Sequence, residues 1–330
     1  MSFEALVIEG RGHPASVKRL KREDLPVHGG ILIRVEWSGI NYKDALAVTG
    51  KGKIVRASLP FVPGIDLAGT VEESNHPAFP PGMAVLSTGW GVGEKTWGGY
   101  SRFQWMSPEW LVPLPAGLSA RQAMILGTAG FTAFLSLRAI ERYGLPPEDG
   151  PIVVTGASGG VGSFSTLLLA SAGYEVIAVT GKTEAEAYLH DLGAHRILPR
   201  AALQVGARRA LDTGEWAGCI DSVGARVLEA VISRTKKHGV IAACGLAGGS
   251  QLHTTVFPFI LRGIRLIGID SNTCPMQPRK QAWEGLRDLA QSVDLERIAR
   301  DVTLKQVPAA CQQLMKGGIM GRYVIDMRSA

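Results

Sequence analysis

Residues 152–162, Ile-Val-Val-Thr-Gly-Ala-Ser-Gly-Gly-Val-Gly, carry the pattern that decides the fold of this chain. Ile152, Val153 and Val154 form a β-branched run, which is typical of a strand buried on both faces. The glycine spacing Ala157-x-Gly159-x-x-Gly162 follows, and an apolar-periodic segment comes directly after it. A strand, a glycine turn and a helix in this order form the context in which a glycine motif binds a dinucleotide.

The glycine turn has a physical role at each position. Gly159 lets the backbone approach a pyrophosphate, and Gly162 lets the helix pack closely on the strand. The N-terminus of the helix presents free N–H groups to the phosphate charge. We therefore predict cofactor contacts from Ser158, Gly159, Gly160, Val161 and Gly162. The alternative is a plain turn that joins a strand to a helix without a ligand.

The residues from Ile152 onward alternate between strand-like and helix-like segments. Strands are expected at 152–155, 175–180, 196–198, 218–222 and 240–244, with helices around 164–171, 184–192 and 225–232. This alternation predicts a parallel, doubly wound sheet. A last strand is expected in 261–268, where Ile264, Leu266 and Ile269 would be exposed at a free edge. Pairing with the same strand of a second chain would cover both edges, so we expect a homodimer.

The first 120 residues instead show an all-β pattern, in which short strand-like runs are bounded by glycine and proline. The expected strands are 5–8, 31–38, 67–72, 84–87 and 101–105. From Ser119 the apolar spacing becomes helical, in the segments 120–126 and 132–142. Polar residues interrupt this stretch, so we expect a buried helix rather than a membrane span. The predicted parts are 1–120, 121–262 and 263–330, with a final strand at 322–326.

The composition indicates a soluble enzyme with a large core, since the chain has 330 residues of which 46% are hydrophobic. Its four cysteines are widely spaced and form no Cys-x-x-Cys pair, and the N-terminus lacks the apolar segment of a signal peptide. We therefore expect reduced thiols and a cytoplasmic location.

The formal net charge is +6, and the densest basic runs, at 18–22 and 236–238, are interpreted as solvated surface. No nucleic acid and no membrane is expected as a partner.

The order of these parts resembles the medium-chain dehydrogenase/reductase superfamily. Two further stretches carry the resemblance over essentially the whole chain: Gly39-Ile40-Asn41-Tyr42-Lys43-Asp44 and Pro63-Gly64-Ile65-Asp66-Leu67-Ala68-Gly69. The chain is most similar to the zinc-independent, quinone-oxidoreductase-like group and, within it, to the acrylyl-CoA reductase branch. The resemblance implies a GroES-like β-rich catalytic domain and a Rossmann domain.

The chain departs from the zinc alcohol dehydrogenases of the superfamily at the metal ligands. Those relatives have a cysteine near the 41–44 segment and a histidine where Gly64-Ile65-Asp66 stands here. This chain offers Tyr42 and Asp66 instead, and the cysteine-rich loop of a structural zinc is missing. Catalytic zinc requires three such ligands and an open position, so we expect no metal.

A zinc-free site suits a substrate that is already activated for hydride transfer. We expect NADPH-dependent reduction of the carbon–carbon double bond of a short enoyl thioester, with acrylyl-CoA as the first candidate substrate. Charge that develops on the carbonyl oxygen requires a hydrogen-bond donor, and a proton must reach the α-carbon. The alternatives are an NADPH-dependent quinone or enal reductase, and a non-catalytic sensor that only binds NADPH.

Tyr42 is the first candidate for the polar group of this site, because it follows a predicted strand in the segment that supplies catalytic residues across the superfamily. Its hydroxyl can donate a hydrogen bond, or the ring can simply line the cleft and contact the nicotinamide. Asn41 either orients the substrate or ties the loop, and Asp44 is expected to fix the local backbone. By resemblance, Leu246, Ile260, Ser271 and Gly317 are also expected to contact the cofactor.

The choice of cofactor depends on the end of the second strand of the nucleotide domain. NAD-specific sites place a carboxylate there to bind the ribose 2′-OH, whereas this strand ends in Thr180-Gly181-Lys182. Thr180 can bind a 2′-phosphate, Gly181 leaves room for it, and Lys182 adds positive charge. Arg200 follows the third strand, which should lie beside the second. These residues predict a preference for NADPH over NADH as the cofactor. The alternative is that Lys182 and Arg200 are ordinary solvated charges.

Overall fold

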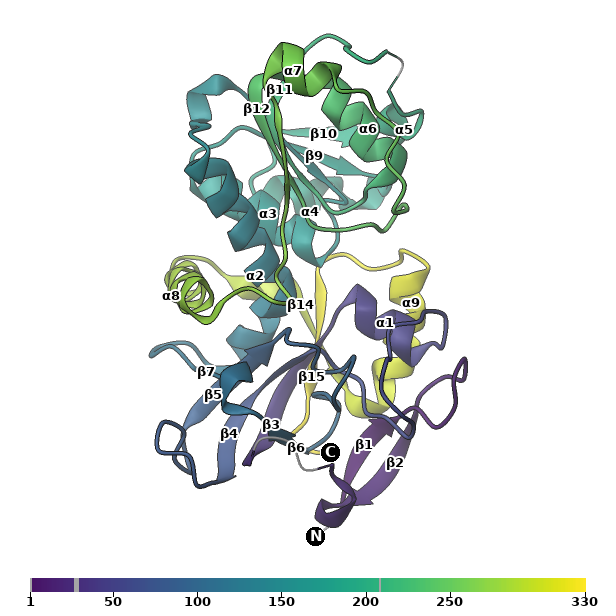
Figure 1. Ribbon diagram of the computed structural model, residues 1–330, viewed down its shortest axis with the longest axis vertical. Coiled ribbons are helices and arrows are strands. Elements are labelled where there is room, and N and C mark those ends of the chain that lie inside the picture. The colour runs from purple at the N-terminus through teal and green to yellow at the C-terminus, as the bar shows by residue number, and fades with distance from the viewer. Residues whose placement is uncertain (1, 27–29, 208) are drawn as a thin grey trace. The chain divides into compact units, whose positions relative to one another are not determined.

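The chain divides into two compact units in the computed structural model, which describes residues 2–26, 30–207 and 209–330 (Figure 1). Unit 1 comprises Met1–Thr128 and Ser271–Ala330, and unit 2 comprises Ala129–Asp270. Helix α2 (Ala120–Arg142) contains the boundary, and its Gly127 has a non-helical backbone with φ of 46°. This glycine separates the two helical segments that the sequence predicts, at 120–126 and 132–142.

Unit 2 is the predicted doubly wound domain, and the fold class expected from the sequence is confirmed. Its sheet has the parallel order β10-β9-β8-β11-β12-β13, and helices lie on either side of it (Figure 1). The strands are β8 (Ile152–Thr155), β9 (Val176–Thr180), β10 (Arg196–Pro199), β11 (Trp216–Asp221), β12 (Thr235–Ala243) and β13 (Arg265–Gly268). The helices after α2 are α3 (Gly160–Ser171), α4 (Glu186–Asp191), α5 (Ala201–Gln204), α6 (Ala225–Arg234) and α7 (Phe257–Arg262).

The prediction for the last strand of this sheet is wrong at its start. Leu261 and Arg262 belong to α7, which ends at Gly263 in the left-handed conformation, and only Arg265–Gly268 form β13. Ile264 is buried in the core of unit 2 rather than exposed at the edge. β13 does lie at the end of the sheet, so its outer side has no neighbouring strand among the described residues.

Unit 1 is built on a β-sheet of order β14-β15-β3-β4-β5-β7, with β6 also paired to β3. Its strands are β3 (Ile31–Ile40), β4 (Asp66–Ser74), β5 (Ala84–Thr88), β6 (Phe103–Met106), β7 (Val112–Pro113), β14 (Ala299–Thr303) and β15 (Arg322–Asp326). β1 (Ser2–Val7) and β2 (Ser16–Lys21) form a separate antiparallel pair. Because β14 and β15 join the same sheet as β3, the two stretches of unit 1 share one core.

The expectation that the first 120 residues are all-β is wrong at α1 (Tyr42–Val48). This helix begins because Asn41 and Asp44 form a capping box, in which each side chain engages the backbone at the position of the other. The later part of unit 1 adds α8 (Met276–Ser292) and α9 (Val307–Met315). Residues 41–44 therefore lie at a strand-to-helix junction.

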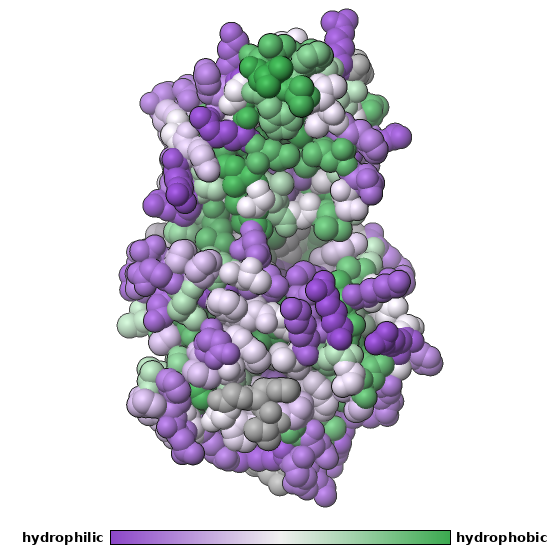
Figure 2. All heavy atoms as spheres, viewed as in Figure 1, coloured by the Kyte–Doolittle hydropathy of each residue, from purple (hydrophilic) through white to green (hydrophobic). Residues whose placement is uncertain are grey.

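Exposed apolar side chains gather over α7, where Figure 2 shows a strongly hydrophobic surface. The residues involved are Val256, Phe257, Ile260 and Leu261.

Helix α2 is long and apolar enough to cross a membrane by composition, but 72% of its most apolar window is buried inside the protein. Burial of this kind is the property of a core helix.

Candidate active site

The glycine turn of unit 2 has the geometry of a phosphate-binding turn. Gly156 has φ of 61°, and Gly159 is the N-cap of α3, so Gly160, Val161 and Gly162 form its first turn. A Cβ on Gly162 would lie 2.3 Å from the carbonyl oxygen of Gly156, which explains why only glycine fits there. A Cβ on Gly159 would meet nothing closer than 3.4 Å. The turn thus leaves room above the free N–H groups of α3, where a pyrophosphate fits.

The buried carboxylate of Asp221 stabilises the strand ends from which the glycine turn begins. Asp221, the last residue of β11, accepts a hydrogen bond from Thr155 Oγ1 at 2.6 Å and another from the Gly224 backbone at 2.8 Å. Thr155 Oγ1 in turn accepts from the Ser222 backbone N–H at 3.0 Å. Burial raises the pKa of Asp221, while these donors oppose the shift. The arrangement fixes the ends of β8 and β11 on which the turn rests.

The cations predicted to bind a 2′-phosphate lie beside the end of β9. The backbone N–H of Arg200 donates to the Thr180 carbonyl at 2.8 Å, and a Cβ on Gly181 would lie 2.8 Å from Arg200 Nη2. Thr180 Oγ1 lies 3.2 Å from Ser158 Oγ and accepts from the Lys182 backbone at 3.1 Å. Burial and the adjacent Arg200 lower the pKa of Lys182, and Glu184 opposes this. Two cations, two hydroxyls and a glycine gap fit a phosphate group at this corner.

The four contacts expected by resemblance fall into both units. Leu246 and Ile260 belong to unit 2 and are exposed, so a ligand can reach them. Ser271 begins the second stretch of unit 1, and its carbonyl accepts from Arg279 Nη2 at 3.0 Å. Gly317 follows α9 with φ of 73°, as the predicted turn requires. These assignments of cofactor contact stay predictions.

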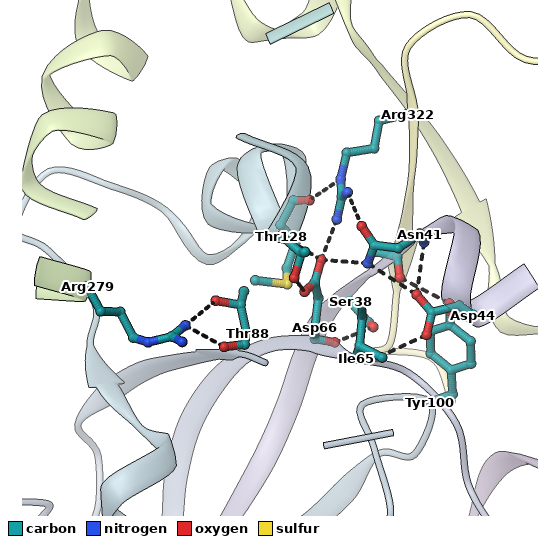
Figure 3. A network of polar contacts seen from close by, with 12 residues as sticks. Ser38, Asn41, Asp44, Ile65, Asp66, Thr88, Tyr100, Thr128, Arg279 and Arg322 are labelled. Atoms are coloured by element: carbon teal, nitrogen blue, oxygen red, sulfur yellow. Dashed lines mark hydrogen bonds and ion pairs between the residues drawn. The ribbon is translucent and has the colours of Figure 1, made fainter. Parts of the chain in front are cut away.

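The centre of the polar network in unit 1 is the buried ion pair between Asp66 and Arg322 (Figure 3). Arg322 Nη2 donates to Asp66 Oδ2 at 2.6 Å, and the two side chains are 1% and 0% exposed. Thr128 donates to the same carboxylate through its backbone N–H at 3.0 Å and its hydroxyl at 2.5 Å. A Cβ on Gly127 would lie 2.1 Å from Arg322 Nη2, so the break in α2 makes room for the guanidinium.

Asn41 joins this pair to the start of α1. Its Nδ2 donates to Asp66 Oδ2 at 2.9 Å and to Asp44 Oδ2 at 3.1 Å, and its Oδ1 accepts from Arg322 Nη1 at 2.7 Å (Figure 3). Both ends of the amide are therefore engaged within the protein. Of the two roles expected for Asn41, this geometry favours tying the loop. Asp44 fixes the local backbone as expected, since it accepts from the backbone of Asn41 and of Ile65, each at 2.9 Å.

Tyr42 differs from its neighbours because it projects from this rigid junction and is 42% exposed. It is the first residue of α1, and Asn41 and Asp44 hold the backbone on which it stands. Tyr323, in β15, is by contrast buried and donates to Gln313 Oε1 at 2.9 Å. The structure thus leaves the hydroxyl of Tyr42 available for a ligand.

The stability of the protein should depend on the protonation of Asp44. Burial, reinforced by the negative charge of Asp66, raises the pKa of Asp44 to about 7. The folded state therefore binds this proton more tightly than the unfolded chain does, and the contribution of Asp44 to stability is lost as pH rises toward 7. Between pH 5 and pH 8 we expect a loss of about 3 kcal/mol from this group, since each pH unit below 7 contributes about 1.4 kcal/mol.

Urea unfolding of the wild type and of Asp44→Asn across this pH range measures the effect. The variant has a lower baseline, because its amide nitrogen replaces one of the two carboxylate oxygens, which accept from the backbone N–H groups of Asn41 and Ile65 respectively. The readout is therefore the difference between the two proteins, which should shrink as pH rises. A difference that stays constant would contradict the expectation.

Two family models match parts of this chain. Residues 28–116 match the alcohol dehydrogenase GroES-like domain, and residues 160–292 match the zinc-binding dehydrogenase family. The acrylyl-CoA reductase AcuI of Ruegeria pomeroyi is 48% identical over 99% of this chain and 100% of its own length. The chain belongs to the medium-chain dehydrogenase/reductase superfamily.

Two solved structures of the superfamily cover the same length. The yhdH oxidoreductase of Salmonella enterica, in complex with NADP, is 47% identical over 99% of this chain and 100% of its own, with a TM-score of 0.94. The yhfP protein of Bacillus subtilis, with NAD bound, is 43% identical over 99% of both chains, with a TM-score of 0.93. The superfamily resemblance predicted from the sequence is confirmed.

The matched family is described as a zinc-binding dehydrogenase, but the described residues of this chain do not form a zinc site. Across residues 2–26, 30–207 and 209–330, no three His, Cys, Asp or Glu side chains come together as a metal site. Asp66, the carboxylate that this chain offers in the stretch Gly64-Ile65-Asp66, is paired with Arg322. The donor set that catalytic zinc requires is therefore missing from the described residues.

Sequence reasoning missed two arginines that organise unit 1 of this dehydrogenase fold. Arg322 appears in the sequence only as the start of a strand, and Arg279 lies within a polar helical stretch. Arg279 is nevertheless fully buried and donates to the Thr88 carbonyl at 2.5 Å and to Thr88 Oγ1 at 3.1 Å. With its bond to Ser271, it fixes the start of the second stretch of unit 1 on the end of β5. No local pattern signals either contact, because the partners are distant in the sequence.

Proposed function

We propose that this protein uses NADPH to reduce the carbon–carbon double bond of a short enoyl thioester, with acrylyl-CoA as the substrate and propionyl-CoA as the product. The observation that carries the proposal is the full-length similarity to acrylyl-CoA reductase AcuI in a chain whose described residues lack a zinc donor set. The NADP-bound relative from Salmonella enterica and the corner formed by Thr180, Lys182 and Arg200 support the choice of cofactor.

Unit 2 holds the cofactor in this proposal. The first turn of α3 binds the pyrophosphate through its N–H groups, and Lys182 and Arg200 bind the 2′-phosphate. When bound, the nicotinamide supplies the hydride that goes to the β-carbon of the substrate. Leu246 and Ile260 cover the apolar parts of the ligands.

Unit 1 binds the thioester. The hydroxyl of Tyr42 donates a hydrogen bond to the carbonyl oxygen, where negative charge develops as the β-carbon accepts hydride. Asn41, Asp44 and the pair Asp66–Arg322 keep the backbone at Tyr42 fixed, so little reorganisation is needed. A proton then reaches the α-carbon from a side chain or from water.

The experiment that tests this function measures NADPH oxidation with acrylyl-CoA, crotonyl-CoA, a free enal and a quinone. We expect the highest kcat/KM with acrylyl-CoA and formation of propionyl-CoA. Faster turnover of the quinone would favour the quinone reductase, and a semiquinone signal would identify one-electron transfer. Tight binding of NADPH without turnover of any substrate would favour the sensor.

Chelation should leave the activity unchanged, because the described residues offer no zinc donor set. We expect the same kcat and KM before and after dialysis against a strong chelator, and no gain when zinc is added back. The control is a zinc-dependent alcohol dehydrogenase treated in parallel. Activity that disappears with the chelator and returns with zinc would contradict the assigned chemistry.

We also propose a homodimer in which β13 pairs with the same strand of a second copy. β13 is at the end of the sheet, and exposed apolar residues on the preceding α7 extend the surface beside it (Figure 2). An edge strand with such a surface is an aggregation hazard unless another chain covers it. Two-fold pairing would cover both copies at once.

Leu261→Glu should disrupt this dimer, because it places a carboxylate in the apolar surface of α7. The matched control is Val205→Glu, since Val205 and Leu261 are both 58% exposed but Val205 follows α5, near the opposite edge of the sheet. Sedimentation at micromolar concentration should give a dimer mass for the wild type and the control, and a lower mass for Leu261→Glu. A monomeric wild type would contradict the proposal.

The cytoplasm is the location that we propose for this enzyme. Cys219, Cys244, Cys274 and Cys311 are all free thiols in the structure, which suits a reducing compartment. NADPH and acyl-CoA thioesters are both intracellular metabolites, so the proposed reaction agrees with this location.

A further inference from the structure

The loop that follows α1 carries cations and no acidic residue. Residues 45–65 contain Lys51, Lys53 and Arg56 but neither Asp nor Glu, and all three cationic side chains are exposed. The whole chain is much more nearly balanced, with 35 Lys and Arg against 29 Asp and Glu. Positive charge is therefore concentrated locally in this loop.

A second loop brings another cation to the same place. The backbone N–H of Arg56 donates to the Glu94 carbonyl at 2.8 Å, and the next residue, Lys95, is exposed. Glu94 does not offset these charges, because its side chain is 7% exposed and paired with Lys43 at 2.8 Å. Lys51, Lys53, Arg56 and Lys95, which we call the basic patch, form no ion pair within the described part of the chain.

Helix α1 separates Tyr42, at its N-terminal end, from the loop that carries the basic patch, at its C-terminal end. The backbone N–H of Lys51 donates to the Leu46 carbonyl at 3.1 Å, and Gly52 packs against the Leu46 side chain. The loop is therefore anchored to the C-terminal end of the helix that Tyr42 begins. Along the axis of α1 the two ends are about 9 Å apart.

We infer that the basic patch binds the phosphate groups of coenzyme A. This inference rests on the proposed function, which places the thioester at Tyr42. The pantetheine arm is a long, flexible chain that can run along α1 from Tyr42 to the patch. The pyrophosphate and the 3′-phosphate at its far end carry several negative charges, and Lys and Arg side chains are the groups that bind phosphate. The patch thus gives affinity for the carrier, remote from the reacting carbons.

The test removes three charges of the patch in the variant Lys51→Ser/Lys53→Ser/Arg56→Ser. The control, Lys18→Ser/Arg19→Ser/Lys21→Ser, removes three exposed charges from β2 and therefore changes the net charge equally. Kinetics are measured with acrylyl-CoA and with acrylyl-pantetheine, which has the same reacting group and no phosphate. Isothermal titration with free coenzyme A measures binding without turnover.

In the patch variant we expect KM for acrylyl-CoA and Kd for coenzyme A to rise at least tenfold, as loss of charge-assisted contacts predicts. Kcat, the kinetics with acrylyl-pantetheine and the KM for NADPH should not change. The control should behave as the wild type does. A patch variant that matches the control would overturn the inference, as would a wild type that uses both thioesters equally well.

The titration also separates this inference from the proposed function. If the wild type reduces neither thioester, the proposed function fails, and binding of coenzyme A by the wild type but not by the patch variant still supports the patch. If the wild type does not bind coenzyme A, the inference fails whatever the enzyme reduces.

Discussion

Replacing Arg322 with methionine should lower the free energy of unfolding by about 3–5 kcal/mol. The variant keeps most of the side-chain volume but leaves the Asp66 carboxylate buried without its counter-charge. Thr128 and Asn41 would still donate hydrogen bonds to Asp66, so the loss reflects charge more than hydrogen bonding. The Met124 carbonyl and Asn41 Oδ1 would also lose their donor. Urea denaturation measures the change.

Two further variants show whether the buried charge causes this loss. Arg328→Met breaks the Arg328–Asp326 pair, where the arginine side chain is 58% exposed, and should lower the free energy of unfolding far less than Arg322→Met does. Asp66→Asn/Arg322→Met removes both charges and should be more stable than Arg322→Met alone. If Arg322→Met proved as mild as Arg328→Met, the ion pair would not be the organising contact of unit 1.

Replacing both Lys182 and Arg200 with alanine should raise the KM for NADPH by about 10- to 100-fold, while the KM for NADH stays nearly unchanged. The expectation follows from the geometry at the end of β9, where Arg200 lies against Gly181 and Lys182 is held by Thr180. A charge-assisted hydrogen bond to phosphate contributes roughly 1.5–3 kcal/mol, and a factor of ten in affinity corresponds to about 1.4 kcal/mol. NADH has no 2′-phosphate, so it loses nothing when the cations are removed.

Steady-state kinetics with both cofactors, together with titration of NADP and NAD, would measure this change. The control variant is Lys237→Ala, which removes an exposed cation elsewhere in unit 2. The Bacillus subtilis relative was solved with NAD bound, so cofactor preference within this group has to be measured rather than assumed. Equal losses with both cofactors, or a wild type that prefers NADH, would overturn the assignment.

The fold of unit 2 could be predicted because its signals are local. The β-branched run Ile152–Thr155 coincides with β8, and the glycine turn after it begins α3 as expected. The last strand was harder, because the alternation of Leu261, Arg262, Ile264, Arg265 and Leu266 is strand-like, while α7 in fact continues to Arg262 and ends at Gly263. A glycine directly after a short apolar run is also the sequence signal of a helix end.

The candidate site in unit 1 could be predicted only in part. Asn41 and Asp44 stand three residues apart, and such spacing is the sequence signature of the capping box that starts α1. The predicted role of Asp44 in fixing the backbone agrees with its contacts. By contrast, Asp66 and Arg322 are separated by most of the chain. A single sequence, read without an alignment, contains no signal that these two side chains form an ion pair.

The division of unit 1 into two stretches also affects the order in which the two units can fold during synthesis on the ribosome. Unit 2 is continuous in sequence and can complete its sheet as soon as residues 129–270 have emerged. The first 128 residues are synthesised earlier but must wait, because β15 has to pair with β3 and Arg322 has to reach Asp66. Until then Asp66 cannot be buried without an unpaired charge. The domain that is synthesised second is therefore finished first, and the nascent N-terminal sheet needs protection from aggregation for the longest time.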